Sequence, residues 1–316
     1  MKAVVNNILF YLLYAIWYTL SLLPMWFHHF MADVLYVLVA CVMHYRRAVI
    51  RKNLANAFPE KSERERRTIE HDFYHFFCDY IAETVKFATM SHDEMRRRMT
   101  FEGTEQINEC MARGQSVAVM LGHYGNWEWA VSIRLWLTHP AAAIGHIYHP
   151  LENPAMNRLF LTVRNRMGSE SVPMSETLRW ILKAKREGKP SGLGYISDQV
   201  PLWQNIHHWV DFLNQDTPVF TGVERIARSQ GQAVFYCDVR RVKRGYYQCL
   251  IRPITLNPAQ MPEFAITDAY FSMLQHTICR EPAYWLWSHN RWKRTREEFN
   301  RRFEVVNGRV VERVKA

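Results

Sequence analysis

Two apolar runs open the chain, and they differ in length. The window from Ala3 to Phe27 contains no charged side chain, and about 20 consecutive apolar residues let a helix cross the ~30 Å hydrocarbon core of a bilayer. The second run, Val34 to Met43, is too short to span alone, so we expect it in the membrane interface or packed on the protein. The pattern predicts an N-terminal membrane anchor over residues 1–44, with a hydrophobic hairpin buried in a soluble protein as the alternative.

Helical and strand periodicities alternate through residues 45–316. Ser62 and Glu65 form a capping box, which predicts a long helix ending near Met90. Strand-like runs and helical patterns then follow one another, and Arg244-Gly245 marks a hairpin turn. This alternation predicts an α/β fold in which a mainly parallel central sheet is flanked by helices and has an antiparallel edge. The strand-like runs are 116–121, 141–148, 192–197, 233–239 and 246–254, and the helical ones are 127–137, 154–167, 175–187, 221–229 and 263–280.

The charge balance narrows the possible partners. The formal net charge is +10, and the basic residues form several clusters rather than one tail. Solvated helix faces would explain any single cluster, whereas an anionic membrane, an acidic protein or nucleic acid would explain the total. Basic residues also follow the second apolar run, from Arg46 to Lys52, so the positive-inside rule places the main domain in the cytoplasm. The six cysteines are scattered without a Cys-x-x-Cys pair, which fits a reducing compartment and predicts neither a zinc site nor a redox pair.

A cluster of chemically capable residues follows the predicted strand 116–121. Active sites of α/β folds lie at the carboxyl ends of such strands, and here the chain continues Gly122-His123-Tyr124-Gly125-Asn126-Trp127-Glu128. The glycines permit a sharp turn, Asn126 suits a helix N-cap, and we expect Glu128 to fold back and orient the His123 imidazole. Neither Ser nor Cys adjoins His123, so it would activate an incoming hydroxyl group directly. On spacing alone, a structural histidine beside a turn is the better explanation.

The wider sequence context supports the chemical interpretation. The run His123 to Glu128 resembles the His-x4-Asp/Glu motif of glycerolipid acyltransferases, and in particular that of the bacterial late acyltransferases of lipid A biosynthesis, the lauroyl and myristoyl transferases. The similarity extends along nearly the whole chain. The other matching segments are residues 51–54 with 57–60, 196–199, 220–222 with 227–228, and the Pro-x-x-Tyr-x-Trp-x-His-x-Arg signature within 281–292.

The resemblance implies a function and its partners. Residues 45–316 would be an acyltransferase domain that moves a fatty acyl chain from acyl carrier protein, or from acyl-CoA, to a hydroxyl group of a lipid A precursor. The protein would lie in the bacterial inner membrane with this domain facing the cytoplasm. Acyl carrier protein is acidic, which would suit the arginine clusters. We expect no cofactor, no metal and no nucleic-acid partner. The alternatives are a lysophospholipid or amino lipid as acceptor, or a non-catalytic protein that binds anionic lipid.

The resemblance also implies roles for individual residues. His123 would be the general base and Glu128 its partner, and either Arg164 or Arg166 matches an arginine of the family. Asp198 matches the family's strand-end aspartate, although the sequence continues Gln199-Val200-Pro201 where the family often has a glycine four residues on. Backbone donors near Gly125 and Asn126, or an arginine, would hold the oxyanion. The spacing of His71, His75 and Asp79 on one helical face suggests a metal site only weakly.

Overall fold

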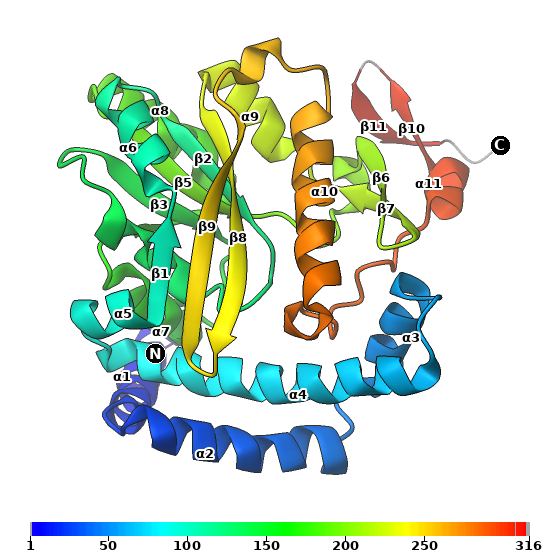
Figure 1. The fold of residues 1–316 in the computed structure, drawn as a ribbon. Helices are drawn as coiled ribbons and strands as arrows, with labels where there is room; N and C mark the ends of the chain where they lie inside the picture. The colour runs from blue at the N-terminus through cyan, green and yellow to red at the C-terminus, as the bar shows by residue number, and fades with distance from the viewer. Residues whose placement is uncertain (1, 307, 314–316) are drawn as a thin grey trace.

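The central sheet confirms the predicted fold class. A computed structural model describes residues 2–306 and 308–313, so residues 1, 307 and 314–316 of the two expected domains lie outside it. Seven strands are ordered β1-β9-β8-β2-β5-β3-β4, mostly parallel, with helices packed around them (Figure 1). Their bounds are β1 Met99–Glu102, β2 Val117–Leu121, β3 Ala143–Tyr148, β4 Glu170–Pro173, β5 Ser191–Ile196, β8 Ala233–Lys243 and β9 Tyr246–Thr255.

The antiparallel part of the sheet is internal, which corrects the expected antiparallel edge. β8 and β9 form the predicted hairpin across Arg244-Gly245, but β1 covers the outer side of β9 in a parallel pairing. Sequence patterns missed β1 because it has only four residues, and its two buried side chains, Met99 and Phe101, are too few to establish a period.

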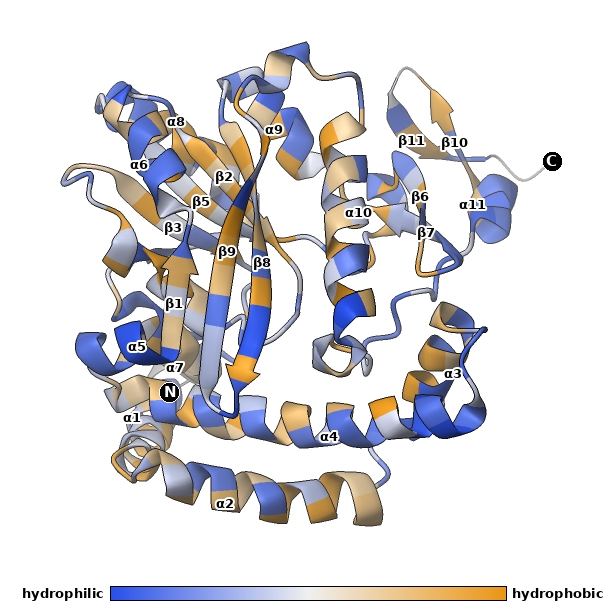
Figure 2. Ribbon diagram, in the orientation of Figure 1, coloured by the Kyte–Doolittle hydropathy of each residue, from blue (hydrophilic) through white to orange (hydrophobic). Residues whose placement is uncertain are grey.

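Strand β2 sets the position of the site. All five of its side chains are buried, as expected of a strand with parallel neighbours on both sides. Leu121 is paired with Ile196 of β5, so the segments that follow these two residues leave the sheet at the same edge. In Figure 2 the middle strands of the sheet are mostly hydrophobic, whereas the surface helix α11 is hydrophilic. His123 and Asp198 follow these strand ends.

The long helix α4 (Glu63–Lys86) crosses one end of the sheet, and α2 lies beside it (Figure 1). The capping box is confirmed, since Ser62 N–H donates to Glu65 at 2.7 Å and the Ser62 side chain accepts from Glu65 N–H. The expected helix 127–137 is instead a 3-10 helix. The remaining helices are α3 Arg47–Ala57, η2 Phe87–Thr89, α5 His92–Arg98, α6 Thr104–Ala112, η3 Trp129–Trp136, α7 Pro154–Asn165, η4 Met174–Glu176, α8 Thr177–Arg186, η5 Trp203–Asn205, α9 Gly222–Gln230, η6 Pro258–Gln260, α10 Ala265–Arg280, η7 Pro282–Tyr284 and α11 Arg296–Arg302.

The N-terminal region is helical, but its division differs from the prediction. The helices are α1 Lys2–Ser21, α2 Met25–Tyr36 and the π-helical η1 Val37–Val42. Pro24 caps α2 and interrupts the window that we expected to be one span, while the second apolar run continues α2. Val4–Ser21 and Met25–Val42 are each long and apolar enough to cross a membrane. Their surfaces expose large side chains such as Trp26, whose exposed fraction is 70%.

Two small hairpins complete the described chain. β6 (His208–Phe212) pairs with β7 (Gln215–Val219), and β10 (Phe303–Val306) pairs with β11 (Arg309–Glu312). Trp203 of η5, the short helix that precedes β6, stacks on Phe303 of β10. Together with α10 and α11 they flank the carboxyl-end side of the sheet.

Candidate active site

A cavity of about 890 Å³ opens beside the carboxyl ends of β2, β5 and β3. His123, Glu128, Arg164 and Gln199 line it, and most of the remaining wall is apolar. The apolar lining includes Val119, Ile133, Ile144, Leu193 and Ile226. A large apolar cavity with a few polar groups at one place is the usual form of a site for a lipophilic ligand.

The imidazole of His123 is held by Asp198. His123 Nδ1 lies 2.6 Å from Asp198 Oδ1, and the His123 backbone N–H donates to Oδ2 at 2.9 Å. Trp285 adds an indole N–H that donates to Oδ2 at 2.7 Å. Burial alone would raise the pKa of Asp198, but the charge of His123 and these hydrogen bonds outweigh burial and lower it to about 2. An ionised Asp198 requires a proton on Nδ1, which leaves Nε2 of a neutral His123 as the base.

Nε2 of His123 lies next to the cavity. The side chain of His123 is 18% exposed, and the Gln199 amide nitrogen is 3.2 Å from Nε2. Trp127 packs edge-on against the imidazole at a centroid distance of 5.3 Å. With Nδ1 bonded to Asp198, Nε2 is the ring nitrogen that can act as a general base when the Gln199 amide gives way to a substrate hydroxyl.

Glu128 is not hydrogen-bonded to His123, contrary to our expectation that it would fold back onto the imidazole. Its carboxylate accepts two hydrogen bonds from Arg164, from Nε at 2.7 Å and from Nη2 at 2.5 Å. The 3-10 helix begins directly after Glu128, and the Glu128 side chain is directed to α7 instead of folding back. Burial would lower the pKa of Arg164, but its bonds to Glu128 raise it. A bidentate ion pair therefore stands beside the His123–Asp198 pair.

The two candidate arginines have different surroundings. Arg164 lines the cavity. Arg166 instead donates to the backbone carbonyls of Phe87, at 3.0 Å, and Met90, where it binds the chain leaving α4. Burial lowers the pKa of Arg166. The structure thus brings Arg164 to the site and gives Arg166 a position outside it.

Gly125 and Asn126 form the turn behind the site. Gly125 has φ +59°, and a Cβ there would lie 2.7 Å from Val239 Cγ1, so a larger residue would strain the backbone and displace Val239. Its N–H donates to the Tyr284 carbonyl at 2.9 Å and so is not free for an oxyanion, contrary to our expectation. Asn126 is fully buried. As expected of a capping residue, its side chain accepts from Trp129 N–H at 3.1 Å.

Other sequence candidates have different partners. Asp79 binds Arg241 and Arg244, and the described residues contain no cluster of three side chains that could hold a metal ion. Sequence reasoning missed the contacts of Trp285 and Gln199 with the His123–Asp198 pair. Trp285 lies within the C-terminal signature and Gln199 directly follows Asp198, so both were within motifs that the sequence had already singled out.

Comparisons with known proteins show which family this chain resembles along its length. The sequence profile described as "Bacterial lipid A biosynthesis acyltransferase" matches residues 3–294. The chain is 22% identical to a lipid A biosynthesis acyltransferase of Haemophilus influenzae over 69% of this chain and 67% of that protein. It is 26% identical to the Escherichia coli lipid A biosynthesis myristoyltransferase over 45% and 43% of the two chains. It is 24% identical to the E. coli lipid A biosynthesis lauroyltransferase over 81% of each chain.

Proposed function

This chain belongs to the bacterial lipid A biosynthesis acyltransferase family, and from that premise we propose that it transfers a fatty acyl chain from acyl carrier protein to a hydroxyl group of a lipid A precursor. The observation that carries the proposal is the His123–Asp198 pair at 2.6 Å beside a largely apolar cavity. The pair supplies a base, and the cavity supplies space for an acyl chain.

The reaction is a direct transfer. His123 Nε2 accepts the proton of the acceptor hydroxyl as its oxygen attacks the thioester carbonyl carbon. The tetrahedral intermediate then expels the thiolate, which takes the proton from His123, so the histidine is regenerated. Asp198 stabilises the imidazolium that forms between these steps. The Gln199 amide, 3.2 Å from Nε2, is the side-chain donor that we assign to the reacting oxygen atoms.

Glu128 and Arg164 form the polar wall of the same cavity. Their paired charges are largely buried, with side-chain exposures of 7% and 22%. Because Glu128 satisfies two guanidinium donors, Arg164 is fixed in orientation beside the reacting groups. We assign this pair to binding the polar part of the substrates, while His123 performs the proton transfer.

Surface properties support a proposal for the location of the protein and for its acyl donor. We propose residues 1–44 as the anchor and 45–316 as the acyltransferase domain, on the cytoplasmic face of the inner membrane. The exposed apolar side chains of α1 and α2 support the first assignment. A net charge of +10 supports both anionic lipid and an acidic acyl carrier protein as partners.

The proposal is tested by acyl transfer to a lipid A precursor. The unmodified protein and His123→Ala would each be assayed with acyl carrier protein and with CoA as carriers of the same acyl chain, and membrane binding would be measured in parallel. We expect His123→Ala to lose transfer and to retain membrane binding. Full transfer by His123→Ala would rule out the assigned base, and equal rates of the unmodified protein with the two carriers would rule out carrier-protein selectivity.

The acceptor is tested in cells. A strain that lacks the protein should make lipid A with one acyl chain fewer, whereas unchanged lipid A with an altered phospholipid or amino-lipid profile would identify the alternative acceptors. An acyl-enzyme isolated after mixing with donor alone would contradict the direct mechanism.

A further inference from the structure

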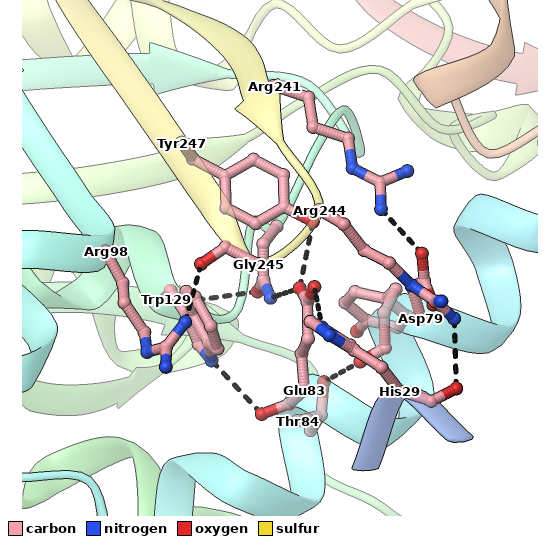
Figure 3. A network of polar contacts seen from close by, with 12 residues as sticks. His29, Asp79, Glu83, Thr84, Arg98, Trp129, Arg241, Arg244, Gly245 and Tyr247 are labelled. Atoms are coloured by element: carbon pink, nitrogen blue, oxygen red, sulfur yellow. Dashed lines mark hydrogen bonds and ion pairs between the residues drawn. The ribbon is translucent and has the colours of Figure 1, made fainter. Parts of the chain in front are cut away.

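Glu83 is a completely buried carboxylate outside the cavity. It lies on α4, where the hairpin β8–β9 and the helix α2 meet (Figure 3). Removing a carboxylate from water is costly unless its oxygens are bonded. The groups that bond to Glu83 therefore indicate its role in the structure.

Those partners come from separate parts of the chain. Glu83 Oε2 accepts from Tyr247 Oη and from Asn126 Nδ2, each at 2.8 Å. The backbone carbonyl of Glu83 accepts from Trp129 Nε1 at 3.2 Å. Glu83 Oε1 is 3.5 Å from His29 Nε2 on α2. Figure 3 shows the Glu83 side chain with Tyr247, Trp129 and His29 gathered around it.

Two of these contacts hold the turn that carries the active-site side chains. Asn126 lies between His123 and Glu128, and its side chain is bonded at both ends, to Glu83 through Nδ2 and to Trp129 N–H through Oδ1. Trp129 is in turn bonded to the Glu83 carbonyl. The position of the turn relative to α4 is thus set at one residue of α4.

We propose that Glu83 is a positioning residue for acyl transfer, whose carboxylate fixes Asn126 and thereby the turn that carries His123 and Glu128. It contacts no residue of the His123–Asp198 pair, so it acts only through Asn126. The His29 side chain faces the other carboxylate oxygen, Glu83 Oε1. Helix α2 therefore also contacts the carboxylate that holds Asn126. This inference rests on the proposed acyl transfer at His123.

Two substitutions of Glu83 distinguish the loss of its hydrogen-bond acceptor from a change in the shape of its side chain. Glu83→Met keeps the length of the side chain and removes the acceptor, and a shift of about 1 Å in a catalytic group can cost about 100-fold in rate. We expect kcat to fall about 100-fold in Glu83→Met with KM for the acyl donor within about twofold, the signature of a lost transition-state alignment. Glu83→Gln keeps an acceptor for Asn126, so we expect it to restore kcat to within about tenfold of the unmodified enzyme.

Two matched controls test whether the effect is merely structural. Asp79→Asn changes a carboxylate one turn earlier on α4, equally buried and bonded to the same hairpin. Tyr247→Phe removes the other donor to Glu83 Oε2 and keeps the ring that packs against Trp129. We expect both to lower the melting temperature in detergent while kcat stays within about threefold.

A failure of this inference can be distinguished from a failure of the proposed function. Equal losses of kcat in Glu83→Met, Asp79→Asn and Tyr247→Phe would overturn the positioning role, as would Glu83→Gln being as impaired as Glu83→Met. If Glu83→Met does not fold, Asn126→Ala tests the same bond from the other side, and an unchanged kcat there overturns the inference. Lost transfer in His123→Ala with full transfer in Glu83→Met would leave the proposed function intact and remove only this inference.

Discussion

The indole of Trp285 donates to Asp198 at 2.7 Å, across 87 residues of sequence. It thereby ties the C-terminal signature to the aspartate that orients His123. Trp285→Phe keeps the ring packing and removes one of the three hydrogen bonds to this carboxylate. A hydrogen bond to a charged group contributes about 1.5–3 kcal/mol, so we expect kcat/KM to fall by about 10- to 100-fold.

Trp287→Phe is the matched control for this prediction. Trp287 is also fully buried, two residues later, but its indole donates to the carbonyl of Pro282. The two variants should lose similar stability and differ in steady-state kinetics. A similar loss of kcat/KM in both would show that the bond to Asp198 has no catalytic effect.

Asp198→Asn tests which carboxyl group serves His123. An amide at this position can donate to Nδ1, which would place the imidazole proton on Nε2 and block the base. The equivalent change in a serine-protease triad costs about 10⁴-fold in kcat, so we expect at least a 100-fold loss here. The measurement is single-turnover acyl transfer near neutral pH, and Glu128→Gln is the comparison. A larger loss of the chemical rate in Glu128→Gln than in Asp198→Asn would contradict the assignment of Asp198.

We expect the buried Glu128–Arg164 ion pair to affect the stability of the protein when either partner is removed. Removing one partner of a buried ion pair costs about 3–5 kcal/mol, because the other charge stays buried and unpaired. We expect Glu128→Gln and Arg164→Met each to lower the unfolding free energy, and the double variant to be less destabilised than the sum of the two. Denaturant unfolding in detergent would measure the unfolding free energies of the three variants and hence the interaction free energy of the pair. Additive effects would show that the two charges do not interact.

Arg166→Met serves as the comparison for Arg164. Arg166 binds the carbonyls of Phe87 and Met90 and has no carboxylate partner in that contact. Its loss should therefore be additive with Glu128→Gln. Coupling of Arg166 to Glu128 of the same size as that of Arg164 would contradict the distinction between them.

The sequence predicted the layers of this fold better than the contacts of its site. Strand β2 and the capping box at Ser62 are local patterns, and both were found where expected. The partner of His123 depends on the pairing of β2 with β5, which puts Asp198 beside a residue 75 positions earlier. Glu128 was the nearer carboxylate in sequence, but the 3-10 geometry after it directs its side chain to Arg164. Spacing along a chain cannot decide between a near and a distant carboxylate when the pairing of two strands brings the distant one to the histidine.

We expect His146 to contribute to the unfolding free energy in a way that is lost in acid. Burial lowers its pKa from 6.5 to about 4, and its Nε2 is bonded to Ser171 Oγ at 2.7 Å. Between these pH values the unfolded chain binds a proton at this histidine and the folded protein does not. The stability that a neutral His146 provides is therefore complete above pH 6.5 and is lost as the pH falls to about 4. A difference of about 2.5 pH units corresponds to about 3 kcal/mol.

His146→Gln isolates this contribution because other histidines titrate equally in both proteins. The unfolding free energy of each would be measured from pH 8 to pH 4 in the same detergent. We expect the unmodified protein to lose stability relative to His146→Gln on acidification, so that the variant becomes the more stable of the two near pH 4, since only the unmodified protein loses stability at residue 146. The glutamine can still donate to Ser171, so the high-pH difference should be small. Parallel stability curves across this range would show that His146 is not held neutral by the fold.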